Sequence, residues 1–187
     1  ILLIAAASVW ARTINVPADY PTIQQALDAA VAGDTIDVAT GVYNEKVAFP
    51  RSGSAAAGYI TLRAAPGATP AIDGTGAAGC NLVTIASRSY VRLVGFELRN
   101  NLAVSDCSGV RVVGSGTNIE IKGNVIHDIR GTDAMGITVY GTDPQPIASL
   151  VIDGNTIYDC EPAQSEALTL NGNVSGFQVT GNIVRDV

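Results

Sequence analysis

One segment recurs four times along this chain of 187 residues, and the repetition limits the folds that are open to it. In each copy aliphatic and polar residues alternate, and the copies end at Gly95, Gly123, Gly154 and Gly181. Successive glycines are 28, 31 and 27 residues apart. In the last three copies asparagine follows the glycine, and an aliphatic residue and an aspartate follow at fixed spacing. A repeat of this length is typical of a solenoid, in which each repeat forms one coil.

A second alternating segment lies in each repeat. Because alternation places every second side chain on the same face, we expect three short strands per repeat, separated by turns. No such strand can bury its apolar side alone, whereas stacked coils bury the aliphatic positions of all repeats in one cylinder. The sequence therefore predicts an all-β fold, a single-stranded parallel β-helix with about five coils. Two inward rows are expected: Val83, Val110, Ile137 and Leu168, and Leu93, Ile121, Ile152 and Val179.

The glycine–asparagine pairs have a mechanical interpretation. A sharp bend between two strands requires a residue with positive φ, which glycine and asparagine tolerate. Stacked at the same height in successive coils, Asn124, Asn155 and Asn182 are predicted to form hydrogen bonds along the axis. Repeat length varies in the other turns, most clearly at residues 143–146, where Asp-Pro-Gln-Pro is inserted.

Residues 21–33 are predicted to form one helix. Thr22 and Gln25 fit a capping box at its start, and Gly33 stands where a left-handed C-terminal cap is expected. An amphipathic helix ahead of the first coil would cover the apolar end of the β-helix. No comparable cap precedes Val187, so we expect the native protein to continue with further C-terminal coils.

The chain opens with an apolar run, residues 1–11, which is shorter than the roughly 20 residues that a membrane-spanning helix needs. Val9 and Ala11 fit a signal-peptidase site. We therefore expect a truncated signal peptide that is cleaved after Ala11; the alternative is a buried first strand. Residues 12–187 would then form the β-helix domain, with its coils at 34–187. Such a leader predicts a protein that is secreted, periplasmic or on the cell surface.

The net charge is −6, and the only lysines are Lys46 and Lys122. A nucleic-acid-binding protein needs a basic stripe to neutralise phosphates, and the sequence has none. The acidic balance also disfavours docking on anionic lipid. We therefore expect neither nucleic-acid binding nor membrane insertion, and a monomer.

The three cysteines are too few for a disulfide framework, and their spacing does not resemble a zinc site. Cys80 and Cys107 are 27 residues apart, so they should lie on adjacent coils within disulfide reach. A bridge and a pair of stacked free thiols both remain open. Cys160 lies on another strand and is predicted to be a lone buried thiol.

Three stretches of the chain carry a resemblance to known proteins. They are residues 14–24 continuing through 33–36 to 41–43, residues 60–67 followed by 72–74, and the Gly-Asn-x-Ile/Val-x-Asp motifs. In them the chain resembles the secreted bacterial right-handed parallel β-helix proteins of the pectate-lyase-like superfamily. Its opening is also similar to the start of alginate-lyase-like and chondroitinase-B-like polysaccharide lyases. The resemblance implies a right-handed coil and activity on polysaccharide.

One outward face is the best candidate for binding sugar. An arginine for a carboxylate, an aromatic ring for stacking and nearby acids suit an acidic glycan. The alternative is a solvated scaffold face with a threonine ladder. Loop acids, among them Asp106, are candidates to hold Ca²⁺, although this segment supplies fewer than the roughly six to eight oxygens that the ion takes. The predicted substrate-binding residues are Arg111, Tyr140, Asn171, Asp133 and Glu166.

Two other polar residues are predicted to be structural. Lys122 should pair with Asp153 one coil on, as Arg92 should with Glu120. The single histidine, His127, shares an outward row with Tyr158 and Arg185 and has no evident partner to orient it as a base.

Two functions follow from these observations. The first is an extracellular polysaccharide-active enzyme, a lyase or epimerase acting on an acidic, uronate-containing glycan, with its catalytic residues beyond Val187. The resemblance implies a Lys or Arg base and often Ca²⁺ for such lyases. The second is a non-catalytic β-helix that serves as an adhesin, a carbohydrate-binding protein or a structural surface protein. A Lys or Arg with clustered acids beyond Val187 would favour the first.

Overall fold

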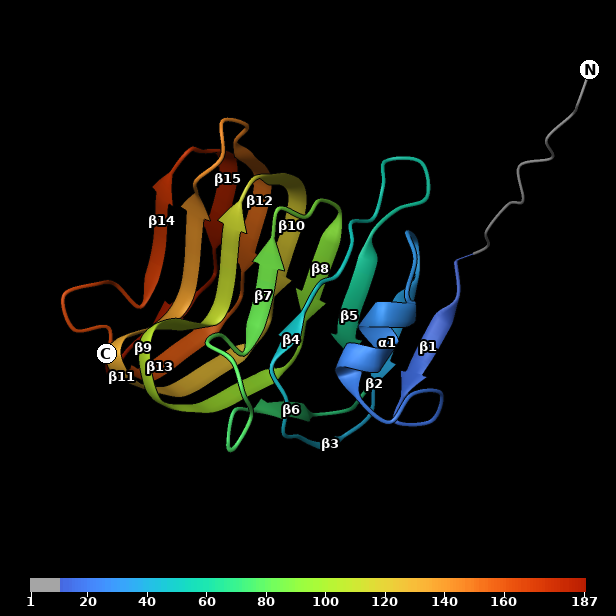
Figure 1. Cartoon of the computed structure of the whole chain (residues 1–187), viewed down its shortest axis with the longest axis horizontal. Coiled ribbons are helices and arrows are strands. Elements are labelled where there is room, and N and C mark those ends of the chain that lie inside the picture. The colour runs from blue at the N-terminus through green and yellow to red at the C-terminus, as the bar shows by residue number, and fades with distance from the viewer. Residues whose placement is uncertain (1–10) are drawn as a thin grey trace, which may run out of the picture.

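The computed structural model describes residues 11–187 as one stack of parallel coils, in which strands of successive coils lie side by side (Figure 1). The expected signal peptide at residues 1–11 lies outside the described residues, apart from Ala11. The regular structure consists of two parallel sheets and one short helix. The fold is the predicted all-β, right-handed parallel β-helix, with about five coils.

Sheet A takes its strands from successive turns of the chain, in the order β1-β2-β5-β8-β10-β12-β15. Its strands alternate because one side faces the core and the other faces solvent. Leu93 of β8 lies beside Ile121 of β10, and both are fully buried. The strands are β1 (Thr13–Val16), β2 (Thr35–Val38), β5 (Ile60–Ala64), β8 (Val91–Val94), β10 (Gly116–Lys122), β12 (Ile147–Asp153) and β15 (Val174–Thr180).

Sheet B forms the other walls of the coils, in the order β16-β13-β11-β9-β6-β3, with β4, β7 and β14 attached to the long strands. The long strands β9 (Glu97–Gly114) and β11 (Val125–Gly141) each run around a corner. Each therefore contains two of the three short strands predicted for its coil. The bends pass through left-handed residues, among them Asp106 and Asp133, both with φ 50°. The others are β3 (Gly41–Tyr43), β4 (Val47–Ala48), β6 (Pro70–Asp73), β7 (Val83–Ala86), β13 (Thr156–Cys160), β14 (Leu168–Gly172) and β16 (Ile183–Val184).

Both predicted inward rows are confirmed by the register. Val83, Val110, Ile137 and Leu168 are successive neighbours, and so are Leu93, Ile121, Ile152 and Val179. The first three residues of each row are fully buried. The last members differ: Leu168 is half-buried, and Val179 is 40% exposed because β15 is an edge strand.

The predicted asparagine ladder is present. Asn124 Nδ2 donates to Asn155 Oδ1, and Asn155 Nδ2 donates to Asn182 Oδ1, both at 2.9 Å. The same oxygens accept from the backbone N–H groups of Asn124 and Asn155. The positive φ that the bend needs falls on the preceding glycine, as at Gly154 with φ 66°. In the coil before the ladder, Phe96 takes this position; its ring is buried and its N–H donates to Asn124 Oδ1.

Helix α1 (Ile23–Ala29) is shorter than the predicted 21–33. Its start is as expected, since Thr22 accepts a hydrogen bond from the Gln25 N–H. It ends at Ala29 with Ala30, not Gly33, as its C-cap, because buried Asp34 accepts from the Val31 N–H and draws the chain out of the helix. Within residues 11–187, no helix is long and apolar enough to cross a membrane.

The helix lies inside the first coil instead of ahead of it, since β1 precedes it and pairs with β2. Its buried residues Ile23, Ala26 and Leu27 join the core. Glu45 accepts hydrogen bonds from the N–H groups of Ile23 and Gln24, which satisfies the first turn. The helix therefore replaces a strand of the first coil and still covers apolar core.

The insertion at 143–146 widens one corner. Residues 142–146 separate β11 from β12, whereas Ser115 alone separates β9 from β10. The register between β10 and β12 is nevertheless continuous from Gly116 and Ile147 onward. Asp143 accepts a hydrogen bond from Ser87 Oγ at 3.0 Å, which ties the wider corner to an earlier coil.

The cysteines resolve the alternatives that the sequence left open. Cys80 and Cys107 form a disulfide with a Cα–Cα distance of 5.3 Å. Cys160 is free and buried, as predicted, and burial raises the pKa of its thiol to about 12. It is therefore a protonated, inert thiol at neutral pH.

Candidate functional site

The predicted sugar-binding face lies on four adjacent strands of sheet B, β7, β9, β11 and β14, which stand side by side in Figure 1. Its register is as expected. Arg111 lies between Thr84 and Thr138, and Tyr140 lies beside Asn171. Residues 27 to 31 positions apart in the sequence are thus brought into direct contact along the axis.

Arg111 is held by three neighbours. Its Nη2 donates to Asp106 Oδ1 at 2.8 Å, and its Nε donates to Thr138 Oγ1 at 3.3 Å. Its guanidinium carbon lies 5.2 Å from the centre of the Tyr140 ring, within cation–π range. The side chain is only 15% exposed, whereas that of Asp106 is 70% exposed. Arg111 therefore presents one edge of its guanidinium to solvent beside an exposed carboxylate.

Tyr140 and Asn171 line a shallow hollow of about 210 Å³ together with Gly141, Thr142 and Gly172. Its volume is below the roughly 300–1,000 Å³ of pockets for drug-sized ligands. The Tyr140 hydroxyl donates to Met135 Sδ at 3.6 Å, and burial raises the pKa of Tyr140. Tyr140 is therefore a protonated phenol at neutral pH and is poorly suited to act as a general base.

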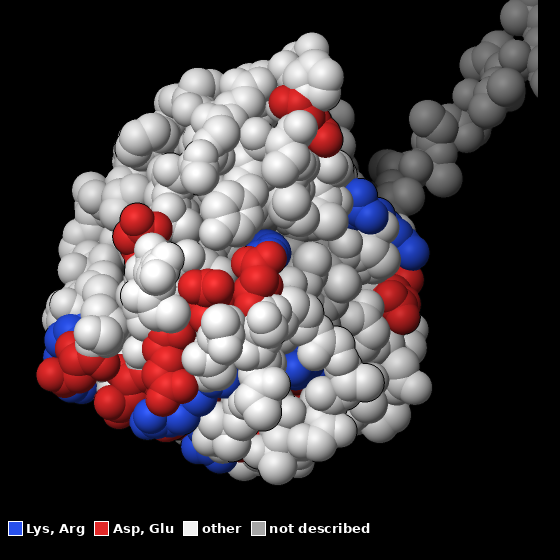
Figure 2. Space-filling model, turned by 60° about the vertical axis from the view of Figure 1, so that its left-hand side comes forward, with Lys and Arg blue, Asp and Glu red and all other residues white. Residues whose placement is uncertain are grey.

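The predicted acids lie on the bends and loops that lead into the strands of this face. Asp133 is the neighbour of Asp106 one coil on, and both occupy left-handed bends. Burial raises the pKa of Tyr140, the charge of Arg111 opposes this rise, and the charges of Asp106, Glu166 and Asp133 add to it. Figure 2, seen from the side of β14, shows acidic side chains gathered on this face with basic ones beside them. Among residues 11–187, no three His, Cys, Asp or Glu side chains are grouped to hold a metal ion.

One lysine was overlooked as part of this face. Lys46 immediately precedes β4, which pairs with β7 and so extends the row of strands. Its Nζ donates to the carbonyls of Gly79 and Cys80 at 2.7 and 3.3 Å, and burial lowers the pKa of Lys46. The sequence did contain a signal for this placement, because Lys46 immediately precedes the residues that pair with Val83 and Thr84. The face therefore has a cation near one end and acids at the other.

The expected threonine ladder is not solvated at Thr138. This side chain is fully buried, and its hydroxyl lies 2.7 Å from Ser108 Oγ. The buried Asn101 side chain lies in the same region: its Nδ2 donates to the carbonyl of Cys80, whereas its Oδ1 has no partner among the described residues. A polar layer thus lies beneath Arg111, where the sequence predicted only a surface row.

Lys122 and His127 are indeed held in side-chain networks, but the partner predicted for Lys122 is wrong. Lys122 lies beside Asp153 in register, yet its Nζ binds Glu120 Oε2 at 2.9 Å. Asp153 accepts from Thr180 Oγ1 instead.

His127 does have partners, contrary to expectation. Its Nδ1 lies 2.8 Å from Asp128 and its Nε2 3.0 Å from Glu97. Its ring stacks on the Tyr158 ring with 4.8 Å between the ring centres, and Arg185 Cζ lies 4.4 Å from the centre of the Tyr158 ring. Both nitrogens are occupied, so His127 belongs to a surface network and not to the candidate face.

These features define a parallel β-solenoid with a polar face along its axis. The chain belongs to the family described as "Protein of unknown function (DUF1565)", which matches residues 11–185. It is 32% identical over 178 residues to a Bacillus subtilis (strain 168) protein, "Uncharacterized protein YwoF". The matched region is 89% of this chain and 37% of that relative, so the chain spans little more than a third of its length. No solved structure gives a significant match.

Proposed function

We propose that this chain is part of an exported, polysaccharide-active protein of the pectate-lyase-like superfamily, and that the β7–β9–β11–β14 face binds an acidic, uronate-containing glycan. One observation carries the proposal: the Arg111 guanidinium lies 5.2 Å from the Tyr140 ring, next to the hollow that Tyr140 shares with Asn171. A guanidinium edge suits a carboxylate, and an aromatic ring suits the apolar face of a sugar.

The face is open and runs along the solenoid axis, which suits a chain-like ligand better than a small enclosed one. Lys46 and Arg111 would bind successive carboxylates, and Asn171 would bind hydroxyl groups. Asp133 and Glu166 flank the path, and Ca²⁺ from solution would bridge them to the acidic glycan.

A lyase or epimerase remains the enzyme form of this proposal, with its catalytic residues in further coils. A non-catalytic carbohydrate-binding or adhesive role is favoured by the state of two site residues: Arg111 is engaged by Asp106 and Thr138, and burial raises the pKa of Tyr140. The residues described supply recognition more readily than proton abstraction.

The experiment measures binding of polygalacturonate, alginate and a neutral glucan, with and without Ca²⁺. The variants are Arg111→Ala and Tyr140→Ala, with Gln178→Ala on the exposed outer side of β15 as the matched control. We expect each site variant to weaken acidic-glycan binding at least about tenfold, as the loss of a charge-assisted hydrogen bond or a stacking ring predicts. Unchanged binding in both variants would leave this face as scaffold. An unsaturated product after incubation identifies a lyase, and a changed ratio of uronate epimers identifies an epimerase; a binding protein yields neither.

A further inference from the structure

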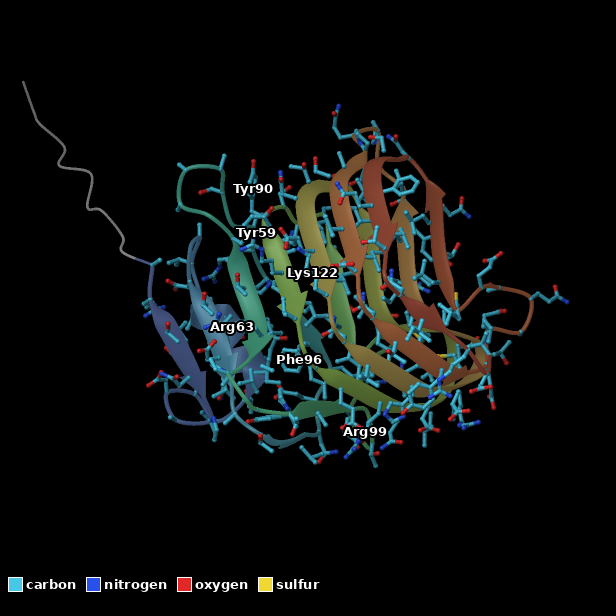
Figure 3. All side chains as sticks on the ribbon, turned by 180° about the vertical axis from the view of Figure 1, so that it is seen from behind. Tyr59, Arg63, Tyr90, Phe96, Arg99 and Lys122 are labelled. Atoms are coloured by element: carbon cyan, nitrogen blue, oxygen red, sulfur yellow. A yellow bond between two sulfur atoms is a disulfide. The ribbon has the colours of Figure 1, made fainter. Side chains whose placement is uncertain are left out.

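The outer side of sheet A carries a second polar cluster, on a different sheet from the groove proposed above. It consists of Tyr59, Arg92, Glu120 and Lys122. Arg92 and Glu120 are neighbours on β8 and β10, and Lys122 follows Glu120 on the same face of β10. Figure 3 shows Tyr59 and Lys122 on this side of the molecule, with Tyr90 near Tyr59.

The carboxylate of Glu120 is shared between two cations. Its Oε1 accepts from Arg92 Nη2 at 3.0 Å, and its Oε2 pairs with Lys122 Nζ at 2.9 Å. The Glu120 side chain is 14% exposed, whereas those of Arg92 and Lys122 are each 38% exposed. The cluster therefore carries one more positive than negative charge, in a protein whose net charge is −6.

Sharing leaves one donor of Arg92 without an acceptor. Nε and Nη2 form one edge of a guanidinium, and a carboxylate normally accepts from both. Arg63 on the same sheet face shows this full arrangement, with Nε and Nη2 bound to the two oxygens of Asp37. In Arg92 only Nη2 is bound, and Nε is buried without a partner among the described residues. The second oxygen that Nε would use is held by Lys122.

Solvent does not satisfy this donor. The Tyr59 ring lies over the guanidinium, with 3.7 Å between its centre and Arg92 Cζ. Tyr59 in turn packs edge-on against Tyr90, at 5.6 Å between ring centres. Because the Tyr59 ring covers one face of Arg92, an incoming group reaches the cluster through Lys122, whose side chain is 38% exposed.

From this geometry we infer that Lys122 is a binding site for an oxyanion, a carboxylate or a sulfate, and that Glu120 changes partners when the anion binds. The anion takes Lys122 Nζ, and Glu120 Oε2 is released. Glu120 then binds Arg92 through both oxygens, as Asp37 binds Arg63. Binding thus satisfies a buried donor that is unpaired in the free protein. No bond is made or broken other than hydrogen bonds and ion pairs.

The proposal is tested by NMR of the Arg Nε–H groups in the 187-residue chain, with sodium glucuronate, sodium sulfate and glucose as probes. We expect glucuronate, sulfate or both to shift the Arg92 Nε–H signal saturably and to slow its exchange with water. Glucose should have no effect. The Arg63 Nε–H signal is the internal control and should not move. A response to one anion alone identifies carboxylate or sulfate as the preferred group.

The matched variant is Lys122→Met, which removes the ammonium and keeps an apolar stem. In it Glu120 is free to bind both donors of Arg92, so the Arg92 Nε–H should be slow to exchange without any ligand. Anion affinity should fall at least about tenfold. Arg111→Ala, on the other sheet, should respond as the unaltered chain does. The inference is overturned if neither anion moves the Arg92 signal, or if Lys122→Met responds with unchanged affinity.

Discussion

The carboxamide of Gln24 forms two hydrogen bonds with the backbone of Ala48: its Nε2 donates to the Ala48 carbonyl at 3.1 Å, and its Oε1 accepts from the Ala48 N–H at 2.8 Å. Ala48 belongs to β4, whose other side pairs with β7. A side chain of the helix thus occupies the hydrogen-bonding edge that another coil would otherwise use. Such an edge is a template for unwanted strand pairing when it is left open.

Replacing Gln24 with alanine should therefore destabilise the N-terminal coil and expose this edge. We expect a loss of about 1–2 kcal/mol in the free energy of unfolding, the sum of two ordinary hydrogen bonds. Urea denaturation measures the change, and light scattering reports association through the edge. Gln25→Ala is the control, because the side chain of Gln25 is exposed on the same helix. Equal effects of the two variants would show that helix propensity, not the contact with Ala48, is responsible.

The asparagine ladder should be far more sensitive at its buried centre. Asn155→Ala leaves the buried backbone N–H of Asn124 without its acceptor, and it also removes a hydrogen bond to the Ile121 carbonyl. We expect a loss of about 3 kcal/mol in unfolding free energy, because buried polar groups without partners are costly. Asn44→Ala, at an exposed position, should change stability by less than about 0.5 kcal/mol. Similar urea midpoints for the two variants would contradict a structural role for the ladder.

Acid should destabilise the protein partly through Asp73. Burial opposes ionisation, but hydrogen bonds from Thr75, Arg99 and Asn100 lower the pKa of Asp73 to about 2 from its ordinary 3.8. A folded-state pKa below the unfolded value gives stability that is present above pH 3.8 and is lost as pH falls towards 2. The stabilisation is about 2 kcal/mol at neutral pH.

The variant Asp73→Asn isolates this contribution. It should be less stable than the unaltered chain at neutral pH, and the difference should shrink between about pH 4 and pH 2 as the native carboxyl becomes protonated. Urea titrations at several pH values provide the measurement. A difference that stays constant over this range would assign the effect to packing instead of charge.

The disulfide between Cys80 and Cys107 should stabilise the middle coils. It closes a loop of 27 residues, for which chain entropy predicts about 3.5 kcal/mol. The double variant Cys80→Ser/Cys107→Ser should unfold at lower urea, and a reductant should lower the midpoint of the unaltered chain but not that of the variant. If the reductant has the same effect on both proteins, the change does not come from this bridge.

Several parts of the structure could be predicted because they depend on local alternation and on the repeat period. The rows through Val110 and Leu93 follow from these two features alone, as does the juxtaposition of Cys80 and Cys107. The register places Lys122 beside Asp153 correctly, but it does not decide which carboxylate the long side chain reaches. Thr180 from the next coil engages Asp153, and this competition is a property of three coils together.

The juxtaposition of the candidate residues could be predicted, but the depth at which they lie could not. Arg111, Tyr140 and Asn171 share a face because they share a register. Thr138 was expected on the same solvated row, yet it is buried beneath Arg111 and against Ser108. The prediction of the helix end was wrong for a similar reason. Gly33 has the positive φ of a cap, but Asp34 accepts hydrogen bonds from Val31, three residues before it, and from Arg12, and the helix ends earlier.

The corner at residues 142–146 has a practical consequence. It inserts five residues where the coil before it has one, and β10 and β12 still pair in register on its far side. This corner therefore accommodates extra residues without a shift in the register of the walls. A foreign peptide grafted between Thr142 and Pro146 should be displayed at the surface while the coils assemble as before, which makes the chain a scaffold for presenting short epitopes.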